Sequence, residues 1–137
     1  MILDTSVLIA AERGAVRIEP FLESLGDEPV AIAAITASVL LHGCHRAAEP
    51  AVRARRTAFV EALLDVLPVL PFGLQEARCH AELWATLARK GRSVGAHDLL
   101  IGATALAQGH AVATLDERDF GRMAGVRLAP IPRSMRG

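Results

Sequence analysis

Short apolar runs alternate with longer segments of helical character along the whole chain, and this alternation constrains the fold more than any other feature of the sequence. The apolar runs lie at residues 1–4, 30–34, 66–70, 111–114 and 126–128. Strands that are apolar throughout are typical of parallel sheets, which are buried on both faces. Parallel strands also need crossover connections, which are usually helices. The pattern therefore predicts an α/β domain of three layers, with a parallel sheet covered by helices on both faces.

Helical segments fill the intervals between these runs. We expect helices at about residues 6–13, 17–25, 36–46, 50–65, 75–89, 96–107 and 117–123. Gly14, Gly26, Gly91 and Gly109 follow four of them, where helices commonly end, and Pro50 stands in the first turn of another. No linker divides the chain, so residues 1–132 are expected to form one domain and residues 133–137 a disordered tail.

The composition excludes several classes of protein. With 52% hydrophobic and 22% charged residues, the chain lacks the apolar-poor, highly charged composition of a disordered protein. Its 15 basic and 15 acidic residues exclude a protein that is polycationic as a whole, although not a local basic face. Cys44 and Cys79 lie far apart, and neither of the two uncharged stretches reaches the roughly 20 apolar residues of a membrane span. We therefore expect a cytoplasmic protein with reduced cysteines and no membrane segment.

Four aspartates stand where a parallel sheet places its ligands. Asp4 ends the first apolar run, Asp116 follows the fourth, Asp119 comes one helical turn later, and Asp98 lies in the first turn of a predicted helix. Ligands of such sheets bind at the carboxyl ends of the strands. Carboxylates brought together there repel unless a cation lies among them, and Mg²⁺ or Mn²⁺ prefers such oxygen ligands. The set predicts a metal site suited to phosphodiester hydrolysis, although each aspartate taken alone could be a helix cap.

Four blocks of sequence carry a family resemblance: MILDTSVLIA, AITASVLLHG, GRSVGAHDLLIGATAL and ATLDERDF. In this order they resemble the PIN domain, specifically the VapC toxins of bacterial toxin–antitoxin pairs, from Met1 to about Leu128. The resemblance implies a PIN-like domain with a five-stranded parallel sheet and a Mg²⁺- or Mn²⁺-dependent endoribonuclease site. It also implies a cytoplasmic homodimer that acts on RNA and is neutralised by a cognate VapB-like antitoxin.

The resemblance also implies roles for individual residues. The catalytic and metal-binding positions are Asp4, Asp98 and Asp116, and the supporting positions are Thr5, Ser6 and Asp119. Separately, the basic cluster of Arg53, Arg55 and Arg56 is the best candidate for contacts with RNA phosphates. A solvated helix face is the alternative interpretation of these arginines.

One acidic position of the family is missing from this chain. The family pattern T-x-x-E-L-x-x-G falls on residues 36–43, where Val39 stands at the place of the glutamate. With Thr36 as the N-cap, residue 39 is also the third helical position, where Glu or Gln completes a capping box. We hypothesise that metal affinity and turnover are reduced in this chain while the fold is intact.

Three classes of function stay open at this point. The first is a metal-dependent ribonuclease toxin, and the second is a catalytically silenced PIN domain that still binds RNA or its antitoxin, as Val39 suggests. The third is another acidic α/β enzyme such as a phosphatase, which is disfavoured because Thr5 and Ser6 follow Asp4 where the DxDx[TV] pattern is required. A P-loop NTPase is excluded because the sequence has no GxxxxGK[ST] loop.

Overall fold

A computed structural model describes residues 1–136 of the chain. Its strands are two residues long, shorter than the apolar runs that predict them. In chain order they are β1 (Ile2–Leu3), β2 (Ile32–Ala33), β3 (Val69–Leu70) and β4 (Val112–Ala113). β1 pairs with β4 and β2 pairs with β3, and both pairs are parallel.

Two parallel bridges join these pairs into one sheet. Ile2 bridges to Ala31, just before β2, and Val112 bridges to Leu128, which adds a fifth parallel segment beyond β4. The order across the sheet is therefore β3, β2, β1, β4 and the segment at Leu128, as the predicted five-stranded parallel sheet requires. The chain moves from β1 to β2 and β3 on one side and then returns to the other side of β1. The strand order thus reverses between β1 and β4, where sheets of this kind bind ligands.

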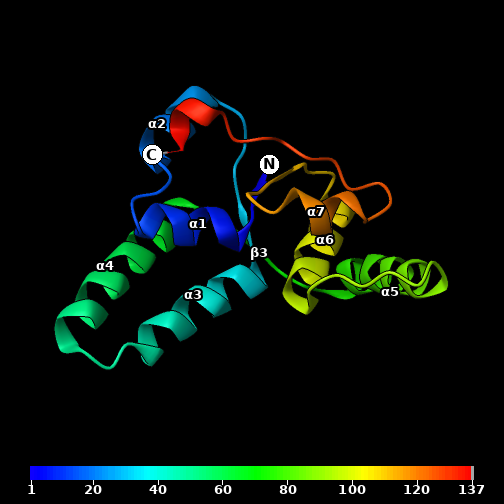
Figure 1. The fold of residues 1–137 in the computed structure, drawn as a ribbon, viewed down its shortest axis with the longest axis horizontal. Coiled ribbons are helices and arrows are strands. Elements are labelled where there is room, and N and C mark those ends of the chain that lie inside the picture. The colour runs from blue at the N-terminus through cyan, green and yellow to red at the C-terminus, as the bar shows by residue number, and fades with distance from the viewer. Residues whose placement is uncertain (137) are drawn as a thin grey trace.

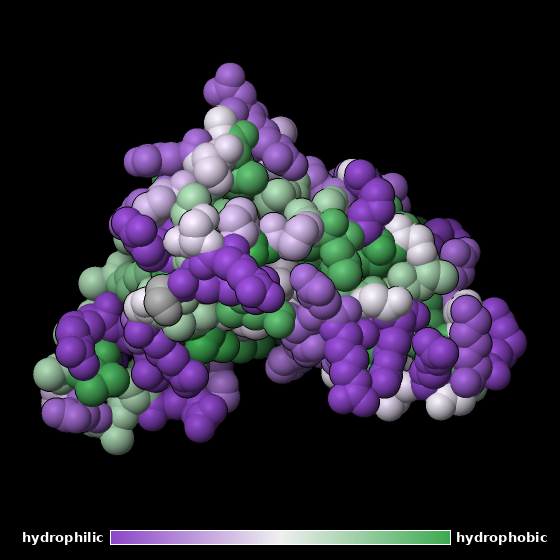
Figure 2. Space-filling model, turned by 45° about the horizontal axis from the view of Figure 1, so that its top comes forward, coloured by the Kyte–Doolittle hydropathy of each residue, from purple (hydrophilic) through white to green (hydrophobic). Residues whose placement is uncertain are grey.

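Seven α-helices surround the sheet within residues 1–136 (Figure 1). They are α1 (Thr5–Glu12), α2 (Ile18–Ser24), α3 (Ala34–Arg46), α4 (Pro50–Val66), α5 (Leu74–Arg89), α6 (Ala96–Gln108) and α7 (Glu117–Gly121), and a 3-10 helix, η1, follows at Arg133–Met135. In Figure 1, α3 and α4 extend to one side and α5 extends to the other. Figure 2 shows a hollow between these two sides, with hydrophilic side chains over the side that α5 forms. In this part of the chain, none of the helices is both long enough and apolar enough to cross a bilayer.

The start of α3 differs from the sequence-based expectation. β2 leads into the helix without a loop, so Ala33 occupies the N-cap position that Thr36 was expected to fill. Thr36 lies inside the helix instead, fully buried, and its hydroxyl accepts a hydrogen bond from Thr5 Oγ1 at 3.0 Å. The capping-box argument for residue 39 is therefore wrong, because Val39 lies in the second turn of the helix rather than at its third position.

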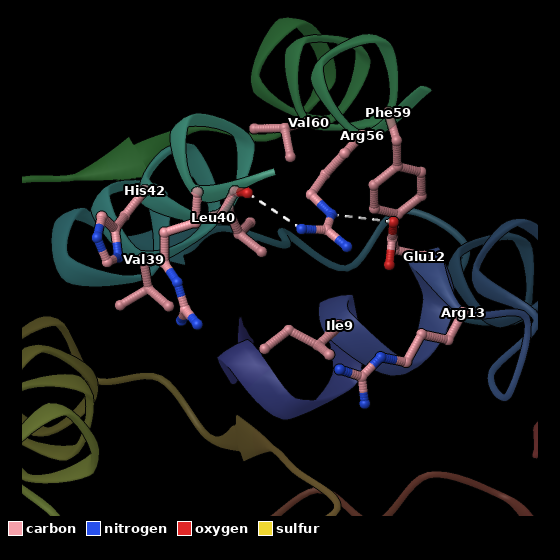
Figure 3. A pocket seen from close by; sticks show the side chains of 11 residues that line it. Ile9, Glu12, Arg13, Val39, Leu40, His42, Arg56, Phe59 and Val60 are labelled. Carbon is pink, nitrogen blue, oxygen red and sulfur yellow. Dashed lines mark hydrogen bonds and ion pairs between the residues drawn. The ribbon is translucent and has the colours of Figure 1, made fainter. Parts of the chain in front are cut away.

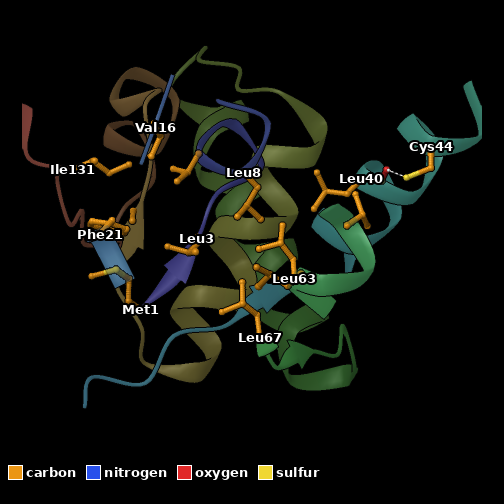
Figure 4. Packing of buried hydrophobic residues seen from close by; sticks show 14 residues of the cluster. Met1, Leu3, Leu8, Val16, Phe21, Leu40, Cys44, Leu63, Leu67 and Ile131 are labelled. Carbon is orange, nitrogen blue, oxygen red and sulfur yellow. Dashed lines mark hydrogen bonds between the residues drawn. The ribbon is translucent and has the colours of Figure 1, made fainter. Parts of the chain in front are cut away.

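Side chains of β1, β2 and β4 alternate between two hydrophobic cores. Leu3 and Ile32 belong to a cluster with apolar residues of α1 to α4 (Figure 4). Ile2 and Ala33, their neighbours in sequence, belong to a second cluster with residues of α5, α6 and α7. Successive side chains of a strand point to opposite faces. The two cores therefore confirm the predicted three layers, with the sheet in the middle.

Close contacts fix α6, whose first turn reaches the candidate site. Glu76 of α5 is only 4% exposed, and its carboxylate accepts hydrogen bonds from the Gly73 N–H at 2.8 Å and from Gln108 Nε2 at 3.0 Å. Gly102 of α6 lies so close to Met123 that a Cβ atom at this position would overlap the methionine sulfur. The helix is thus held to α5 on one side and to the residues after α7 on the other.

The C-terminal residues pack beside α2. The Arg17 N–H donates to the carbonyl of Met135 at 2.9 Å, and Val16 forms an antiparallel bridge with Arg136. Met135 also packs against the first core cluster. The structure thus gives residues 133–136 backbone partners where the sequence predicts a disordered tail, because the apolar Met135 is anchored by a non-local contact. Gly137 lies outside the described residues.

Candidate metal centre

The candidate site lies at the edge of the sheet where the strand order reverses. Asp4 follows β1 directly, and Asp116 follows the neighbouring β4 after two intervening residues. Asp98 occupies the first turn of α6, and Asp119 lies in α7. Four separate elements therefore deliver the four aspartates that the sequence singles out.

Three of these aspartates form a compact cluster. Carboxylate oxygens of Asp98, Asp116 and Asp119 all lie within 4.8 Å of one another. Asp119 Oδ2 also accepts a hydrogen bond from the Gly95 N–H at 3.0 Å, which fixes α7 against the start of α6. Three carboxylates at this spacing offer the oxygen ligands that a hard divalent cation prefers. Asp119, expected only near the site, is thus part of the cluster itself.

The surroundings of Asp98 disfavour its ionised form. Burial raises the pKa of Asp98 from 3.8 to about 7, with further contributions from the charge of Asp4, a hydrogen bond with Asp119, and the charges of Asp119 and Asp116. Every one of these causes disfavours the ionised form of the carboxyl group. A cation among the carboxylates would offset the repulsion that they exert on one another.

Asp4 is the most deeply buried of the four aspartates, with 2% of its surface exposed. Its Oδ2 accepts hydrogen bonds from Ser6 Oγ at 2.7 Å and from Thr114 Oγ1 at 2.8 Å. Its Oδ1 is buried as well and has no hydrogen-bond partner among the described residues. Leaving a buried oxygen without a partner is unfavourable, and a metal ion is a partner that suits a carboxylate. The all-aspartate donor set therefore fits Mg²⁺ or Mn²⁺.

The two hydroxyl residues that follow Asp4 have different partners. Ser6 donates to Asp4, which is the contact expected of a supporting group. Thr5 donates to Thr36 on α3 and so connects the starts of two helices. The structure thus brings Ser6 to the carboxylates, whereas the hydroxyl of Thr5 is used between α1 and α3.

Sequence analysis missed one polar residue of the site, Thr114. It lies directly after β4 with 1% of its surface exposed, and it contacts both Asp4 and the backbone of Asp116. The available signal was a hydroxyl residue at the end of a buried strand, two positions before an aspartate. That signal does not tell whether the hydroxyl points to the site or into the core.

Val39 is one of the residues that line a cavity (Figure 3). The cavity has a volume of about 200 Å³ and lies between α1, α3 and α4, with Ile9 and Phe59 among its apolar lining residues. Within residues 1–136, its lining includes none of the four aspartates. Residues three apart on a helix share a face, so Val39 lies one turn beyond Thr36, whose partner Thr5 adjoins Asp4.

The three arginines of α4 differ in their contacts. Arg53 donates to two backbone carbonyls at and just beyond the end of α3, at 2.9 and 3.2 Å. Arg56 forms an ion pair with Glu12 of α1 at 3.4 Å and donates to a carbonyl of α3 at 3.1 Å. Arg55 is exposed. Two of the three guanidinium groups therefore hold α4 against the neighbouring helices.

Comparison with known proteins identifies the family. The PIN domain family matches residues 1–126 of the chain. Ribonuclease VapC1 of Rickettsia felis is 33% identical over 96% of each chain, and ribonuclease VapC5 of Mycobacterium tuberculosis is 36% identical over 96% of this chain and 93% of its own. The structure of DNA-bound VapBC from Salmonella typhimurium contains a similar chain, with a TM-score of 0.85 and 29% identity over 94% of this chain and 96% of that one. The chain belongs to the PIN domain family, and its relatives there are VapC ribonucleases.

Proposed function

We propose that this chain is a VapC-type toxin, a metal-dependent endoribonuclease that hydrolyses phosphodiester bonds of RNA. The observation that carries the proposal is the buried Oδ1 of Asp4, which has no partner among the described residues and lies at the same sheet edge as the aspartate cluster. The relatives named ribonuclease VapC support this class of reaction.

The cation would be held by Asp4, Asp98 and Asp116. Asp119 would be a further carboxylate beside it. Mg²⁺ or Mn²⁺ is the ion that suits these ligands. When bound, such an ion activates a water molecule and stabilises negative charge on phosphate and leaving oxygens. RNA phosphates and four carboxylates would otherwise repel one another, so the cation is also what makes binding of the substrate favourable here.

Other groups of the chain hold the carboxylates in place. Ser6 and Thr114 fix Asp4 through Oδ2, which leaves Oδ1 for another ligand. Because the pKa of Asp98 is about 7, this carboxyl group carries a proton in about half of the metal-free molecules at neutral pH. Asp98 would hold a cation in its deprotonated form, since metal ligands must be deprotonated.

Substrate contacts outside the acidic centre are proposed for the basic face of α4. Arg53 and Arg55 are both exposed, but only Arg55 of the three arginines makes no side-chain hydrogen bond or ion pair within residues 1–136, so it can contact an RNA phosphate without breaking one. Arg53 and Arg56 would have to give up the hydrogen bonds that they make to α3 and α1. We therefore assign the larger share of any phosphate contact on α4 to Arg55.

The proposed partners are a cognate VapB-like antitoxin and a second copy of the chain, in the cytoplasm. The solved relative from Salmonella typhimurium is described as VapBC, which supports an antitoxin partner. The homodimer is supported by apolar side chains exposed at and just before α5, where Trp84 is 63%, Leu74 69% and Phe72 39% exposed. Large apolar patches on a soluble domain commonly mark protein contacts.

Val39 leaves the site one carboxylate short of the family pattern, so we propose that the activity of this chain is weaker than that of a Val39→Glu variant. The same observation favours a second candidate function, a silenced PIN domain that binds RNA or its antitoxin without cleavage. The two candidates differ in activity and not in fold.

Cleavage of structured and single-stranded RNA in Mg²⁺ or Mn²⁺ tests both candidates. The chains to compare are the wild type, Val39→Glu, and Val39→Glu combined with Asp98→Asn. Weak cleavage by the wild type, stronger cleavage by Val39→Glu and none by the double variant is the expected result. Cleavage that survives Asp98→Asn would contradict the proposed site. Binding of RNA with no cleavage by any chain would favour the silenced domain.

A further inference from the structure

Thr114 joins two of the proposed metal ligands through a single oxygen atom. Its Oγ1 donates a hydrogen bond to Asp4 Oδ2 and accepts one from the backbone N–H of Asp116, both at 2.8 Å. β1 and β4 are neighbours in the sheet, so this oxygen connects the ends of two adjacent strands. The side chain is almost completely buried, which keeps water from competing for either bond.

The number of protons available fixes the direction of these hydrogen bonds. A backbone N–H can only donate, so Thr114 accepts from Asp116 and its one hydroxyl proton is left for Asp4. Ser6 repeats this arrangement, because its Oγ donates to the same Oδ2 and accepts the N–H of Leu115 at 3.2 Å. The two hydroxyl oxygens lie 3.5 Å apart, and neither has a proton left for the other. Oδ2 of Asp4 is thus held from two sides.

We propose that Thr114 is a positioning residue that sets the placement of Asp4 relative to Asp116 for the cation. The inference rests on the proposed function, because it assumes that these two carboxylates hold a metal ion. Fixing Oδ2 leaves the partnerless Oδ1 in one orientation, and the same hydroxyl holds the backbone that carries the second ligand. The β-branched side chain suits this task, since its χ1 angle is restricted. Loss of the hydroxyl would release both ligands together.

Thr104 provides a matched control for this role. It is as buried as Thr114, with 1% of its surface exposed, and its hydroxyl also donates at 2.8 Å. The acceptor is the backbone carbonyl of Leu100 within α6, and the hydroxyl makes no contact with the aspartates among the described residues. Thr104→Val and Thr114→Val therefore remove the same atoms from equally buried positions, but only the second change affects the proposed ligands.

The test is the affinity for Mn²⁺, measured by calorimetry and by the electron paramagnetic resonance signal of free Mn²⁺. The full chain is compared with Thr114→Val, Thr114→Ser and Thr104→Val, and thermal unfolding in EDTA checks that each one is folded. We expect Thr114→Val to bind Mn²⁺ about 10- to 100-fold more weakly, as is usual when a group that orients a metal ligand is lost. Thr114→Ser keeps the hydroxyl and should restore most of the affinity, while Thr104→Val should bind like the wild type.

The outcomes separate this inference from the proposed function. If the wild type binds Mn²⁺ and Thr114→Val binds it equally well, or if Thr104→Val loses as much affinity, the positioning role is wrong and the metal centre stands. A wild type that binds no Mn²⁺ would overturn the proposed function and this inference with it. Should Thr114→Val fail to fold, Thr114→Cys takes its place, because a thiol is similar in size but a weak donor.

Discussion

Asp98→Asn should make the metal-free protein more stable and remove its response to metal. Burial and the neighbouring carboxylates raise the pKa of Asp98 from 3.8 to about 7. A change of this size corresponds to about 4 kcal/mol if the group were fully shielded from solvent. Asp98 is only half-buried, so solvent screening reduces the destabilisation by its charge to about 1–2 kcal/mol. Asparagine keeps the size of the side chain and removes the charge.

One effect opposes this gain in the stability of the metal-free protein. Asp98 lies in the first turn of α6, where a negative charge stabilises the helix by about 0.3–1 kcal/mol. Asparagine loses this contribution. Repulsion within the cluster is the larger of the two effects, so the variant should be more stable than the wild type by about 1 kcal/mol at pH 8.

The difference should depend on pH in a defined direction. The pKa of Asp98 is higher in the folded than in the unfolded protein. Between about pH 4 and pH 7 the folded state therefore binds more protons, and the free energy of unfolding of the wild type falls as the pH rises through this window. The advantage of Asp98→Asn should accordingly shrink when the pH is lowered from 8 to 5.

Urea unfolding in EDTA at pH 8 and pH 5 measures these differences. Asp27→Asn, at an exposed aspartate before β2, is the matched control and should show neither effect. Adding Mn²⁺ at pH 8 should stabilise the wild type, because the ion binds only the folded state, and should leave Asp98→Asn almost unchanged. An Asp98→Asn variant no more stable than the wild type at pH 8 in EDTA would refute the reasoning from charge repulsion.

Three other substitutions test separate features. Val39→Glu should tighten Mn²⁺ binding in calorimetry and raise the rate of RNA cleavage; if neither changes, residue 39 lies out of reach of the aspartates. Gly102→Ala should lower the free energy of unfolding in urea by about 1–3 kcal/mol, because the added Cβ overlaps the Met123 sulfur. Its control is Gly121→Ala, where the added Cβ faces open space and should change the free energy of unfolding by less than about 0.5 kcal/mol. Glu76→Ala should lower the thermal midpoint through a loss of about 1–2 kcal/mol, since two hydrogen bonds to a buried carboxylate disappear; an unchanged midpoint would show that they contribute nothing.

The layers of the fold and the edge that carries the site were predictable because both depend on local pattern. Ile2 and Leu3 are both apolar and both fully buried, as residues on the two faces of a covered parallel strand must be. Asp4 follows them, and an acidic residue at the end of such a strand can only lie at the edge of the sheet. The position of the candidate site therefore follows from sequence alone.

The partners of individual side chains were not predictable, because they depend on direction in three dimensions. Thr5 and Thr114 are both hydroxyl residues next to candidate ligands, yet only Thr114 donates to Asp4. In the sequence, Arg56 belongs to what looks like an exposed basic cluster. Its neighbours along the chain do not show that it forms an ion pair with Glu12. The predicted start of α3 was wrong for a similar reason. Thr36 has the residue type of an N-cap, and the sequence does not show that its hydroxyl is buried against Thr5.

The strand order also determines when, during synthesis, the proposed metal site can form. The ribosome releases the chain from its N-terminus, so the first three strands and α1 to α4 can pack while the rest is still being made. β4 joins β1 only after this, because residue 112 pairs with residue 2, and such distant pairings form slowly. A nascent chain therefore contains Asp4 but not the aspartates at 116 and 119. The proposed metal site can therefore form only after the ribosome has made the chain as far as Asp119, however early the first core has packed.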